Sequence, residues 1–313
     1  MARPVGNLLS FLRFLNKREN IPLNINFVED YLSCSRDCLI GYLDLLKDNG
    51  FKILLKGDEI TLLNKVDLLD KERIYREVKG RGRIDVIDVV GSTNNELLQR
   101  AFNIASGDSL LTEIQTAGRG QQGIGWRSGI AQQLCLSMGW IFSSLEKIQG
   151  LSIAVGVEIA RELSKRGLDV KVKWPNDLFL NGLKLGGILV ETLNYKDKIV
   201  VVIGVGLNVH HTEFSNLSRK VAFLDDVKAF SRNESAIIVL NALKLACSTI
   251  SYRSFSFYPK SIVQYDYLLG KEITIITPQG KVVGISRGVS EKGELLLENS
   301  QGLTKISSGH VIL

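Results

Sequence analysis

The chain has 313 residues, of which 45% are hydrophobic and 23% are charged, with a formal net charge of +6. This length accommodates two or three domains with hydrophobic cores, and the positive charge permits an anionic partner without naming one. No stretch approaches the roughly 18 uninterrupted apolar residues of a membrane span, so no membrane association is predicted. The four cysteines form no C-x-x-C pair and the three histidines complete no zinc pattern. We therefore predict a reduced, cytoplasmic protein without a structural metal.

The N-terminal region has the pattern of three short helices. Apolar residues at helical spacing predict a first helix over 8–15 and a second over 27–32. A third helix is predicted between Ser35, a suitable N-cap, and Gly50, a suitable stop.

A predicted hairpin follows these helices, with strand-like runs at 51–55 and 60–63. Helices followed by a β-ribbon are typical of a winged helix-turn-helix, a common DNA-binding unit, which we assign to residues 1–66. The outward face of the third helix carries three carboxylates against two cations, a poor surface for phosphates. Two interpretations stay open, a DNA-binding module and a module that serves only packing or protein contacts. The candidate DNA contacts are Ser35, Arg36, Lys47 and Lys56.

The rest of the chain divides into three parts. Residues 67–83 are highly charged, which favours a solvated linker. Residues 84–268 mix strands and helices and contain the motifs that suggest chemistry. Residues 269–313 contain short strands separated by turn signals, which predict a small β-barrel.

The segment Gly118–Trp126 is rich in glycine and lies in a run, 114–145, that has no Asp or Glu. Such a backbone lets N–H groups converge on an anion, and Arg119 adds a positive charge. The letters also fit G-x-G-x-x-G, but no helix follows and no acid appears at the spacing that a dinucleotide site requires. No Gly-Lys-Ser/Thr closes the loop either, so a Walker site is excluded. An anion-binding loop and an ordinary surface loop remain as alternatives.

A strand-to-helix junction precedes this loop. Asp88–Val90 read as a strand, and Thr93 with Glu96 predicts a capping box at the start of a helix. The N-terminus of that helix would offer N–H donors to an acyl or ureido oxygen.

Lysines mark the next two motifs. Asn181-Gly182 is a strong hairpin signal and places Lys184 opposite Phe179. A lysine there is either a solubilising edge residue or a fixed cation. Together with Arg119 and Lys173, it would reduce the repulsion between two anions, as when a carboxylate attacks a nucleoside triphosphate. No Ser-His-Asp set, carboxylate pair or Cys-His pair is evident, so hydrolysis by a nucleophile is not predicted.

These motifs resemble, in order and spacing, those of the biotin protein ligases, and specifically the bifunctional ligases that also repress the biotin operon. The matching segments are Ser92–Asn94, Gln115–Trp126, Lys173–Asp177, Lys184–Glu191, Gly204–Asn208 and, near the C-terminus, Gly284–Gly288.

The resemblance implies an α+β protein with an N-terminal winged helix, a central mixed-sheet domain like the class II synthetases and a C-terminal SH3-like barrel. It implies that biotin and MgATP give biotinyl-5′-AMP, from which biotin passes to a lysine of the biotin carboxyl carrier protein of acetyl-CoA carboxylase. Biotinyl-AMP would promote a homodimer that binds operator DNA. The alternatives are a ligase with a vestigial winged helix and a lipoate-type ligase.

The resemblance also assigns residues. Lys184 and Arg119 would be catalytic, and Asp177 would bind Mg²⁺. The segment 209–222 would order over the adenine. Biotin would contact Ser92, Thr93, Asn94, Gln115, Gly118, Arg119, Gly120, Gln121, Lys184, Gly187 and Gly206, and ATP or the adenylate would contact Arg119, Trp126, Lys173, Asn176, Asn208 and Arg287.

Three positions in the glycine-rich segment depart from the family pattern. Gln121 stands where some members have arginine, and Ile124 and Gly125 replace basic residues. Fewer cations favour a looser hold on the adenylate.

Overall fold

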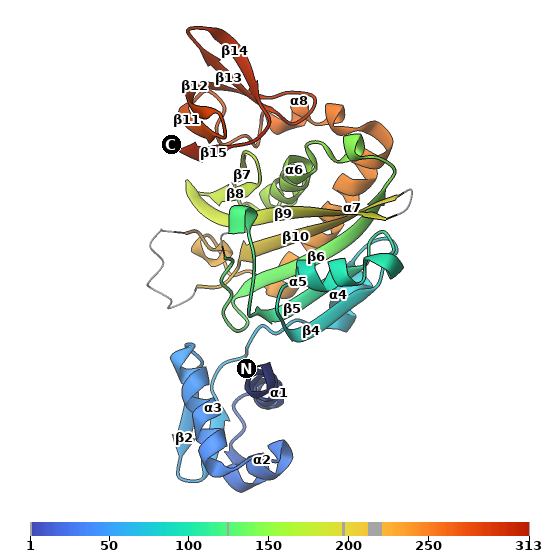
Figure 1. Cartoon of the computed structure of the whole chain (residues 1–313). Helices are drawn as coiled ribbons and strands as arrows, with labels where there is room; N and C mark the ends of the chain where they lie inside the picture. Colours follow the sequence, from blue (N-terminus) through green and yellow to red (C-terminus); the bar gives the residue numbers. More distant parts are fainter. Residues whose placement is uncertain (1, 124, 196–197, 212–220, 313) are drawn as a thin grey trace.

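The computed structural model describes residues 2–123, 125–195, 198–211 and 221–312 (Figure 1). An N-terminal helical unit lies at one end, a seven-stranded sheet forms the middle and a smaller sheet lies at the other end (Figure 1).

The N-terminal unit contains the predicted helices and hairpin. Ser35 caps its third helix by accepting a hydrogen bond from the Cys38 N–H at 3.3 Å, and Gly50 follows the helix with φ of +81°, so both predicted signals are confirmed. The prediction missed a two-residue strand that pairs with the hairpin. The elements are α1 (Ala2–Asn16), β1 (Leu23–Asn24), α2 (Ile25–Leu32), α3 (Arg36–Asp48), β2 (Ile53–Lys56) and β3 (Glu59–Leu62), with sheet order β1-β3-β2.

Residues 67–83 differ from the solvated linker that we predicted. They contain helix α4 (Lys71–Glu77), which is capped by Asp70. Ile74 of this helix is fully buried and Leu69 nearly so, and both belong to the core of the central domain. The charge of the segment concealed these apolar positions: Ile74 lies on the face of α4 that packs on the core, and Leu69 lies just before the helix.

The central sheet is mixed, as predicted. Its strand order is β4-β5-β6-β10-β9-β8-β7; β4 and β5 are parallel and every other neighbouring pair is antiparallel. The strands are β4 (Ile84–Val90), β5 (Ser109–Gln115), β6 (Gln133–Phe142), β7 (Val170–Lys173), β8 (Asp177–Leu180), β9 (Leu183–Tyr195) and β10 (Lys198–Asn208).

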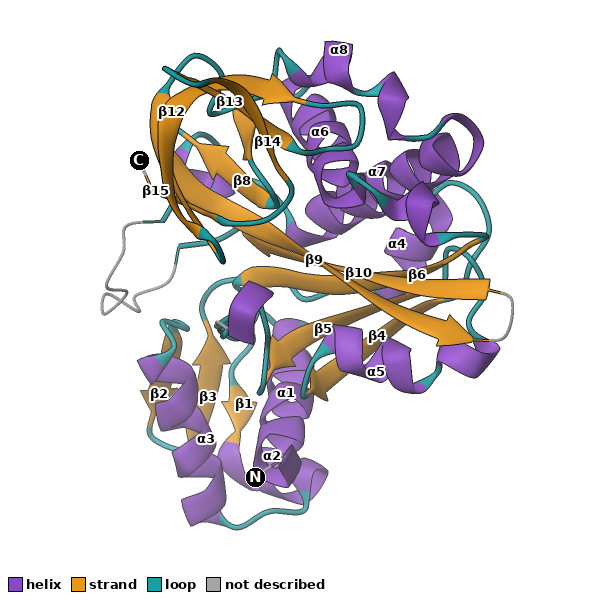
Figure 2. Cartoon of the chain, turned by 45° about the horizontal axis from the view of Figure 1, so that its top comes forward, coloured by secondary structure: helices purple, strands orange, loops and turns teal. Residues whose placement is uncertain are grey.

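Helices cover both faces of this sheet (Figure 2). Helix α5 (Thr93–Gln99) lies on one face, and α6 (Leu151–Ser164) and α7 (Arg232–Arg253) lie on the other. Strand β10 shows the alternation that follows from this arrangement. Val200 and Val202 belong to the apolar cluster beneath α5, whereas Val201 and Ile203 belong to the main core with α6 and α7.

Helix α7 is long and apolar enough, by composition, to cross a membrane. Twelve of its 22 residues are buried inside the fold, among them Leu240, Leu243 and Ala246. Its apolar character is therefore that of a core helix, and its N-terminal Arg232 is fully buried as well.

The C-terminal sheet packs against the central domain. Trp174 Nε1 donates a hydrogen bond to the carbonyl oxygen of Gly293 at 3.0 Å, and Leu295 and Leu297 join the main core. The strand order in the C-terminal sheet is β14-β13-β12-β11-β15, and each pair of neighbouring strands is antiparallel. The strands are β11 (Glu272–Thr277), β12 (Gly280–Val289), β13 (Leu295–Asn299), β14 (Gly302–Ile306) and β15 (His310–Ile312), and the short helix α8 (Pro259–Ile262) precedes them.

Candidate active site

Three neighbouring strands form the floor of the candidate site. In their pairing, Ser137 of β6 lies beside Gly204 of β10, and Gly204 lies beside Leu189 of β9. Side chains two residues apart on a strand share a face, so Gly206 and Gly187 continue the same surface toward one end of the sheet. This is the face that α5 covers.

The glycines of β10 are required because other side chains lie directly on them. A Cβ atom at Gly204 would fall 2.3 Å from Asn94 Oδ1, and one at Gly206 would fall 2.4 Å from Cε2 of the Trp126 ring. Any larger residue would displace Asn94 or Trp126. The two glycines therefore bring the start of α5 and the end of the glycine-rich loop onto the sheet.

The start of α5 differs from the predicted capping box. Ser92 is the N-cap residue, and Thr93 uses its hydroxyl and its N–H to contact Gln115 Oε1, at 3.1 and 2.8 Å. Ser137 Oγ lies 2.7 Å from Thr93 Oγ1 and 2.5 Å from Asn94 Oδ1. Thr93 is buried and faces these polar partners, so its side chain is not available as a cap. The result is a buried polar cluster that joins α5, β5 and β6.

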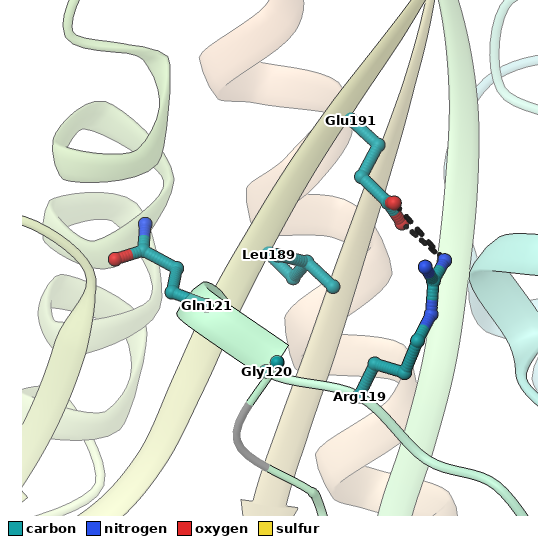
Figure 3. A pocket seen from close by; sticks show the side chains of 6 residues that line it. Arg119, Gly120, Gln121, Leu189 and Glu191 are labelled. Atoms are coloured by element: carbon teal, nitrogen blue, oxygen red, sulfur yellow. Dashed lines mark hydrogen bonds and ion pairs between the residues drawn. The ribbon is translucent and has the colours of Figure 1, made fainter.

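The glycine-rich loop closes on itself. Arg119 and Gly125 form an isolated β-bridge, and the Trp126 N–H donates to the Gly118 carbonyl at 2.9 Å. A short 3₁₀ helix, Gln121–Gly123, lies at its tip, and Ile124 is outside the described residues. A cavity of about 420 Å³ lies beside this loop and is lined by Arg119, Gly120, Gln121, Gly123, Leu189 and Glu191. Figure 3 shows side chains that line it.

Arg119 is held from two sides. Its Nη2 atom lies 3.0 and 3.1 Å from the two carboxylate oxygens of Glu191 (Figure 3). The same atom also donates to Asn95 Oδ1. Glu191 Oε2 in turn accepts a hydrogen bond from Asn94 Nδ2 at 2.8 Å. Glu191, Asn95 and Ser137 were not among the residues predicted for the site. The alternation of β9 contained the signal for Glu191, because it stands two residues beyond Leu189.

No thiol in this region is a candidate nucleophile. Cys135 lies on β6 beside Gly206 and is buried. Burial raises the pKa of this thiol to about 11. It therefore stays protonated near neutral pH and serves as a small apolar side chain.

Lys184 lies at the same end of the sheet as Gly187. The predicted pairing of Lys184 with Phe179 is confirmed. Its Nζ atom is 2.6 Å from Asp177 Oδ1, and its side chain is 43% exposed. A Cβ atom at Gly187 would lie 3.8 Å from Lys184 Nζ, so the ammonium group stands over this glycine. It is a cation next to the site, partly neutralised by one carboxylate.

The remaining residues predicted to contact ATP have other partners in this structure. Lys173 Nζ donates to the Val311 carbonyl at 3.2 Å, and Asn176 Nδ2 donates to the Ile188 carbonyl at 2.8 Å. Asn208 Nδ2 donates to the Ala222 carbonyl at 3.1 Å. Arg287 pairs with Glu298 inside the C-terminal sheet. Their contacts with ATP stay predictions, as does the ordering of segment 209–222, of which residues 212–220 are outside the described part.

Asp177 is a weak fit for a magnesium ligand. Protein sites that bind Mg²⁺ with ATP supply one or two carboxylates beside the phosphate oxygens. The Asp177 carboxylate is already paired with Lys184, and no group of three or more His, Cys, Asp or Glu within the described ranges is placed to hold a metal. An ion here would compete with Lys184, so the predicted role of Asp177 stays a prediction.

The four residues proposed for DNA contact lie on α3 and at the end of β2. Arg36 contacts Glu29 at 2.6 Å, Asp58 at 3.1 Å and Asn26 at 2.7 Å. Hydrogen bonds first to Glu29 and then to Asp58 raise the pKa of Arg36. Its charge is compensated within the domain. Ser35 caps α3, whereas Lys47 and Lys56 are exposed.

Known proteins share this arrangement. Residues 86–208 match the biotin/lipoate A/B protein ligase family, and residues 268–313 match the biotin protein ligase C-terminal domain. The chain is 32% identical to the bifunctional ligase/repressor BirA of Escherichia coli, over 90% of each chain. It is also 32% identical to a biotin–[acetyl-CoA-carboxylase] ligase of Mycobacterium tuberculosis, over 78% of this chain and 95% of the relative.

A solved structure agrees with these matches. The biotin protein ligase from Aquifex aeolicus in complex with biotin and ATP superposes with a TM-score of 0.64 at 27% identity, covering 74% of this chain and 97% of that one. The matching domains, the extent of the identity and the shared fold together identify this chain as a member of the biotin protein ligase family.

Proposed function

We propose that this chain is a cytoplasmic, ATP-dependent biotin protein ligase that forms biotinyl-5′-AMP and transfers biotin to a lysine of the biotin carboxyl carrier protein of acetyl-CoA carboxylase. One observation carries the proposal. Three motifs far apart in sequence, around Asn94, Arg119–Trp126 and Gly204–Gly206, meet on one face of the sheet beside the cavity. Residues 86–208, which contain all three motifs, match the biotin/lipoate A/B protein ligase family.

The chemistry explains why cations are needed there. A biotin carboxylate oxygen attacks the α-phosphorus of ATP, the bond between the α-phosphorus and the bridging oxygen breaks, and pyrophosphate leaves. Both reactants are anions, so Arg119 and Lys184 would lower their repulsion and stabilise the charge that develops. The lysine amine of the carrier protein then attacks the acyl carbon, and AMP leaves.

The polar cluster under α5 suits the head group of biotin. A ureido ring offers one carbonyl acceptor and two N–H donors. The buried Thr93 and Asn94 and the half-buried Gln115 present both donors and acceptors. The ring of Trp126 lies directly on the backbone of β10 at Gly206, which has no side chain. There the ring would stack against a flat group such as the adenine. These roles, the other predicted biotin and ATP contacts and the Mg²⁺ site form part of the proposal.

The domain assignments belong to the proposal as well. Helices α1–α3 with the hairpin β2–β3 would form a winged helix over residues 1–66. Residues 84–268 would form a domain like the class II synthetases, and residues 269–313 would close into an SH3-like barrel. The intervening residues 67–83 would join the first two while packing on the second.

Transfer of biotin to a carrier domain tests the enzyme. Purified protein, ATP, biotin and a biotin carboxyl carrier domain are expected to give a carrier heavier by one biotinyl group, measured by mass spectrometry. Omission of ATP is the control and is expected to abolish the gain. A gain with lipoate but none with biotin would replace the proposal with the lipoate-type alternative.

A second function, repression of the biotin operon by a homodimer, is supported by a specific observation. The relative named as a ligase/repressor matches 90% of this chain, an extent that reaches into the N-terminal unit. Arg36 is paired within the domain, so the exposed Lys47 and Lys56 would contact phosphates.

Operator binding tests this second function. The affinity for DNA upstream of biotin-synthesis genes is expected to rise when biotin and ATP are added, together with a dimer in sedimentation. Lys47→Ala with Lys56→Ala is expected to weaken binding and to reduce its salt dependence. The exposed Lys260→Ala, in α8 far along the chain, serves as the control. Unchanged binding by the double variant would exclude Lys47 and Lys56 as DNA contacts, whereas no rise in DNA affinity with biotin and ATP would favour a ligase with a vestigial winged helix.

A further inference from the structure

We propose that Glu191 is a positioning residue, which orients the guanidinium of Arg119 for adenylate formation and links it to the side chains beneath α5. This inference rests on the proposed ligase function. Arg119 would be the group that touches the reacting anions, and Glu191 would act through it.

The contact between Glu191 and Arg119 constrains the guanidinium. Both oxygens of Glu191 lie within 3.1 Å of the same nitrogen, Nη2 (Figure 3). This nitrogen also donates to Asn95. Arg119 comes from the glycine-rich loop and Glu191 from β9, 72 residues later. The strand is rigid and the loop is not a regular element. The geometry of Arg119 is therefore set by the sheet.

This arrangement leaves donors for a ligand. All three hydrogen bonds use Nη2, and within the described part of the chain Nε and Nη1 form no hydrogen bond or ion pair. Guanidinium has five N–H donors in a fixed plane. With Nη2 fixed on Glu191, the remaining edges keep a defined direction beside the cavity that Arg119 lines. A carboxylate or an α-phosphate oxygen is the kind of acceptor that such edges bind.

Glu191 also belongs to a continuous series of side-chain contacts. Its Oε2 accepts from Asn94 at 2.8 Å, and Asn94 contacts Ser137 at 2.5 Å. Ser137 contacts Thr93 at 2.7 Å, and Thr93 donates to Gln115. The residues that would hold the ligand head are thus connected to the catalytic cation through Asn94 and Glu191. A head group that orders Asn94 would help to order Arg119.

Because Glu191 is charged, replacing it is expected to affect biotin binding and the rate of adenylate formation differently, which a residue needed only for folding would not do. An unpaired carboxylate beside the cavity would repel the biotin carboxylate, and pairing with Arg119 cancels this repulsion. Glu191→Gln removes the negative charge but keeps the side-chain length. The variant is expected to bind biotin as tightly as the unmodified protein or more tightly, while forming the adenylate about 10-fold more slowly because Arg119 loses its orientation.

A double-mutant cycle on the full-length protein tests the inference. Single-turnover rates of biotinyl-AMP formation would be measured for Glu191→Ala, Arg119→Ala and the double variant, with the dissociation constant of biotin measured separately by calorimetry. Arg119→Ala alone is expected to slow the step by roughly 100-fold. The rates are compared at saturating biotin, so that a change in biotin binding does not enter them. If Glu191 acts through Arg119, adding Glu191→Ala to Arg119→Ala then changes the rate by less than about 2-fold. Glu162→Gln, a surface ion-pair residue of α6, is the matched control and is expected to change neither quantity.

The outcomes separate this inference from the function on which it rests. No adenylate from the unmodified protein would overturn both. Normal adenylate formation with independent, multiplying effects of the two alanine variants would overturn the role of Glu191 and leave the ligase intact. A rise in the dissociation constant of biotin for Glu191→Gln, in step with the loss of rate, would point to a merely structural role and would also overturn it. The proposal is supported if Glu191→Ala slows adenylate formation in the protein that keeps Arg119 but has no further effect in Arg119→Ala.

Discussion

The guanidinium of Arg13, in α1, contacts the carboxylate of Glu113, in β5, at 3.1 Å, although the two residues are 100 positions apart. Glu113 is fully buried, and its other oxygen lies 2.6 Å from Arg232, which is fully buried too. Arg13 also pairs with Asp88 at 2.6 Å. The N-terminal unit is therefore attached to the central sheet by a partly buried series of charges. Buried ions are stable only when paired and hydrogen-bonded, which makes each member of such a series depend on the others.

Replacement of Arg13 is expected to loosen this attachment. Arg13→Ala leaves Asp88 and one oxygen of Glu113 without their charged partner, and losing hydrogen bonds to charged groups costs about 1–3 kcal/mol. Urea unfolding followed by far-UV circular dichroism would measure the free energy of unfolding. Lys17→Ala, an exposed neighbour in the chain, is the control and is expected to stay within about 0.5 kcal/mol of the unmodified protein. Equal effects of the two variants would contradict an attachment by Arg13.

The stability is also expected to depend on pH through His210. Burial by itself lowers the pKa of His210, but its contacts with Asp67 at 3.0 Å and Asp225 at 2.8 Å outweigh burial, so the net pKa is raised. A raised pKa contributes stability that is fully present below the unfolded value of about 6.5 and is lost as pH rises through the folded value. The difference in unfolding free energy between the unmodified protein and His210→Asn is expected to be larger at about pH 6 than at about pH 9.

His310→Asn, an exposed residue of β15, is the control for this experiment. A pH-independent difference for His210→Asn would contradict the prediction.

Asp67 is expected to change the free energy of unfolding with pH in the opposite direction, in the acid range. Burial would raise its pKa, but hydrogen bonds from His210 and the Arg232 backbone lower it overall, so its stabilisation is present above the unfolded value and is lost as pH falls through the folded one.

Lys184→Ala is expected to slow adenylate formation by roughly 10²-fold or more, because the α-phosphate loses a cation when charge develops in the transition state. Single-turnover kinetics with rapid quench would measure it. Lys171→Ala is a matched control, since this lysine pairs with Asp169 and bonds the Gln264 carbonyl away from the cavity residues. Unchanged kinetics for Lys184→Ala would assign Lys184 to the solubilising edge residues.

Gly206→Ala is expected to displace Trp126 from the sheet. The new Cβ would lie 2.4 Å from the ring, a distance that requires the indole to move, and overpacking of this kind costs about 1–3 kcal/mol. A changed Trp emission spectrum and weaker ATP binding are the measurements. Gly41→Ala, in α3 with nothing within 4 Å of the added atom, is the control and is expected to stabilise the helix by up to about 1 kcal/mol. A normal Trp spectrum for Gly206→Ala would contradict the packing of Trp126 on β10.

Local patterns of residues sufficed for much of the fold. The cap at Ser35, the stop at Gly50 and the pairing of Lys184 with Phe179 each depend on a few neighbouring residues, and all three were predicted. The capping box at Thr93 was wrong because Thr93 is buried and its hydroxyl donates to Gln115. The solvated character predicted for residues 67–83 was wrong at Leu69 and Ile74, because both are buried in the core of the central domain, which a count of charges does not reveal.

By itself the sequence determined which motifs exist, their order and the family to which they belong, because capping, alternation and glycine turns are properties of short segments. Only the tertiary structure decided which side chains meet. Glu191 holds Arg119 across 72 residues, and Arg13 reaches Glu113 across 100. Such contacts arise from the way strands are ordered in the sheet and from which domain packs on it. A local sequence pattern does not predict these contacts, because each partner taken alone is an ordinary charged residue.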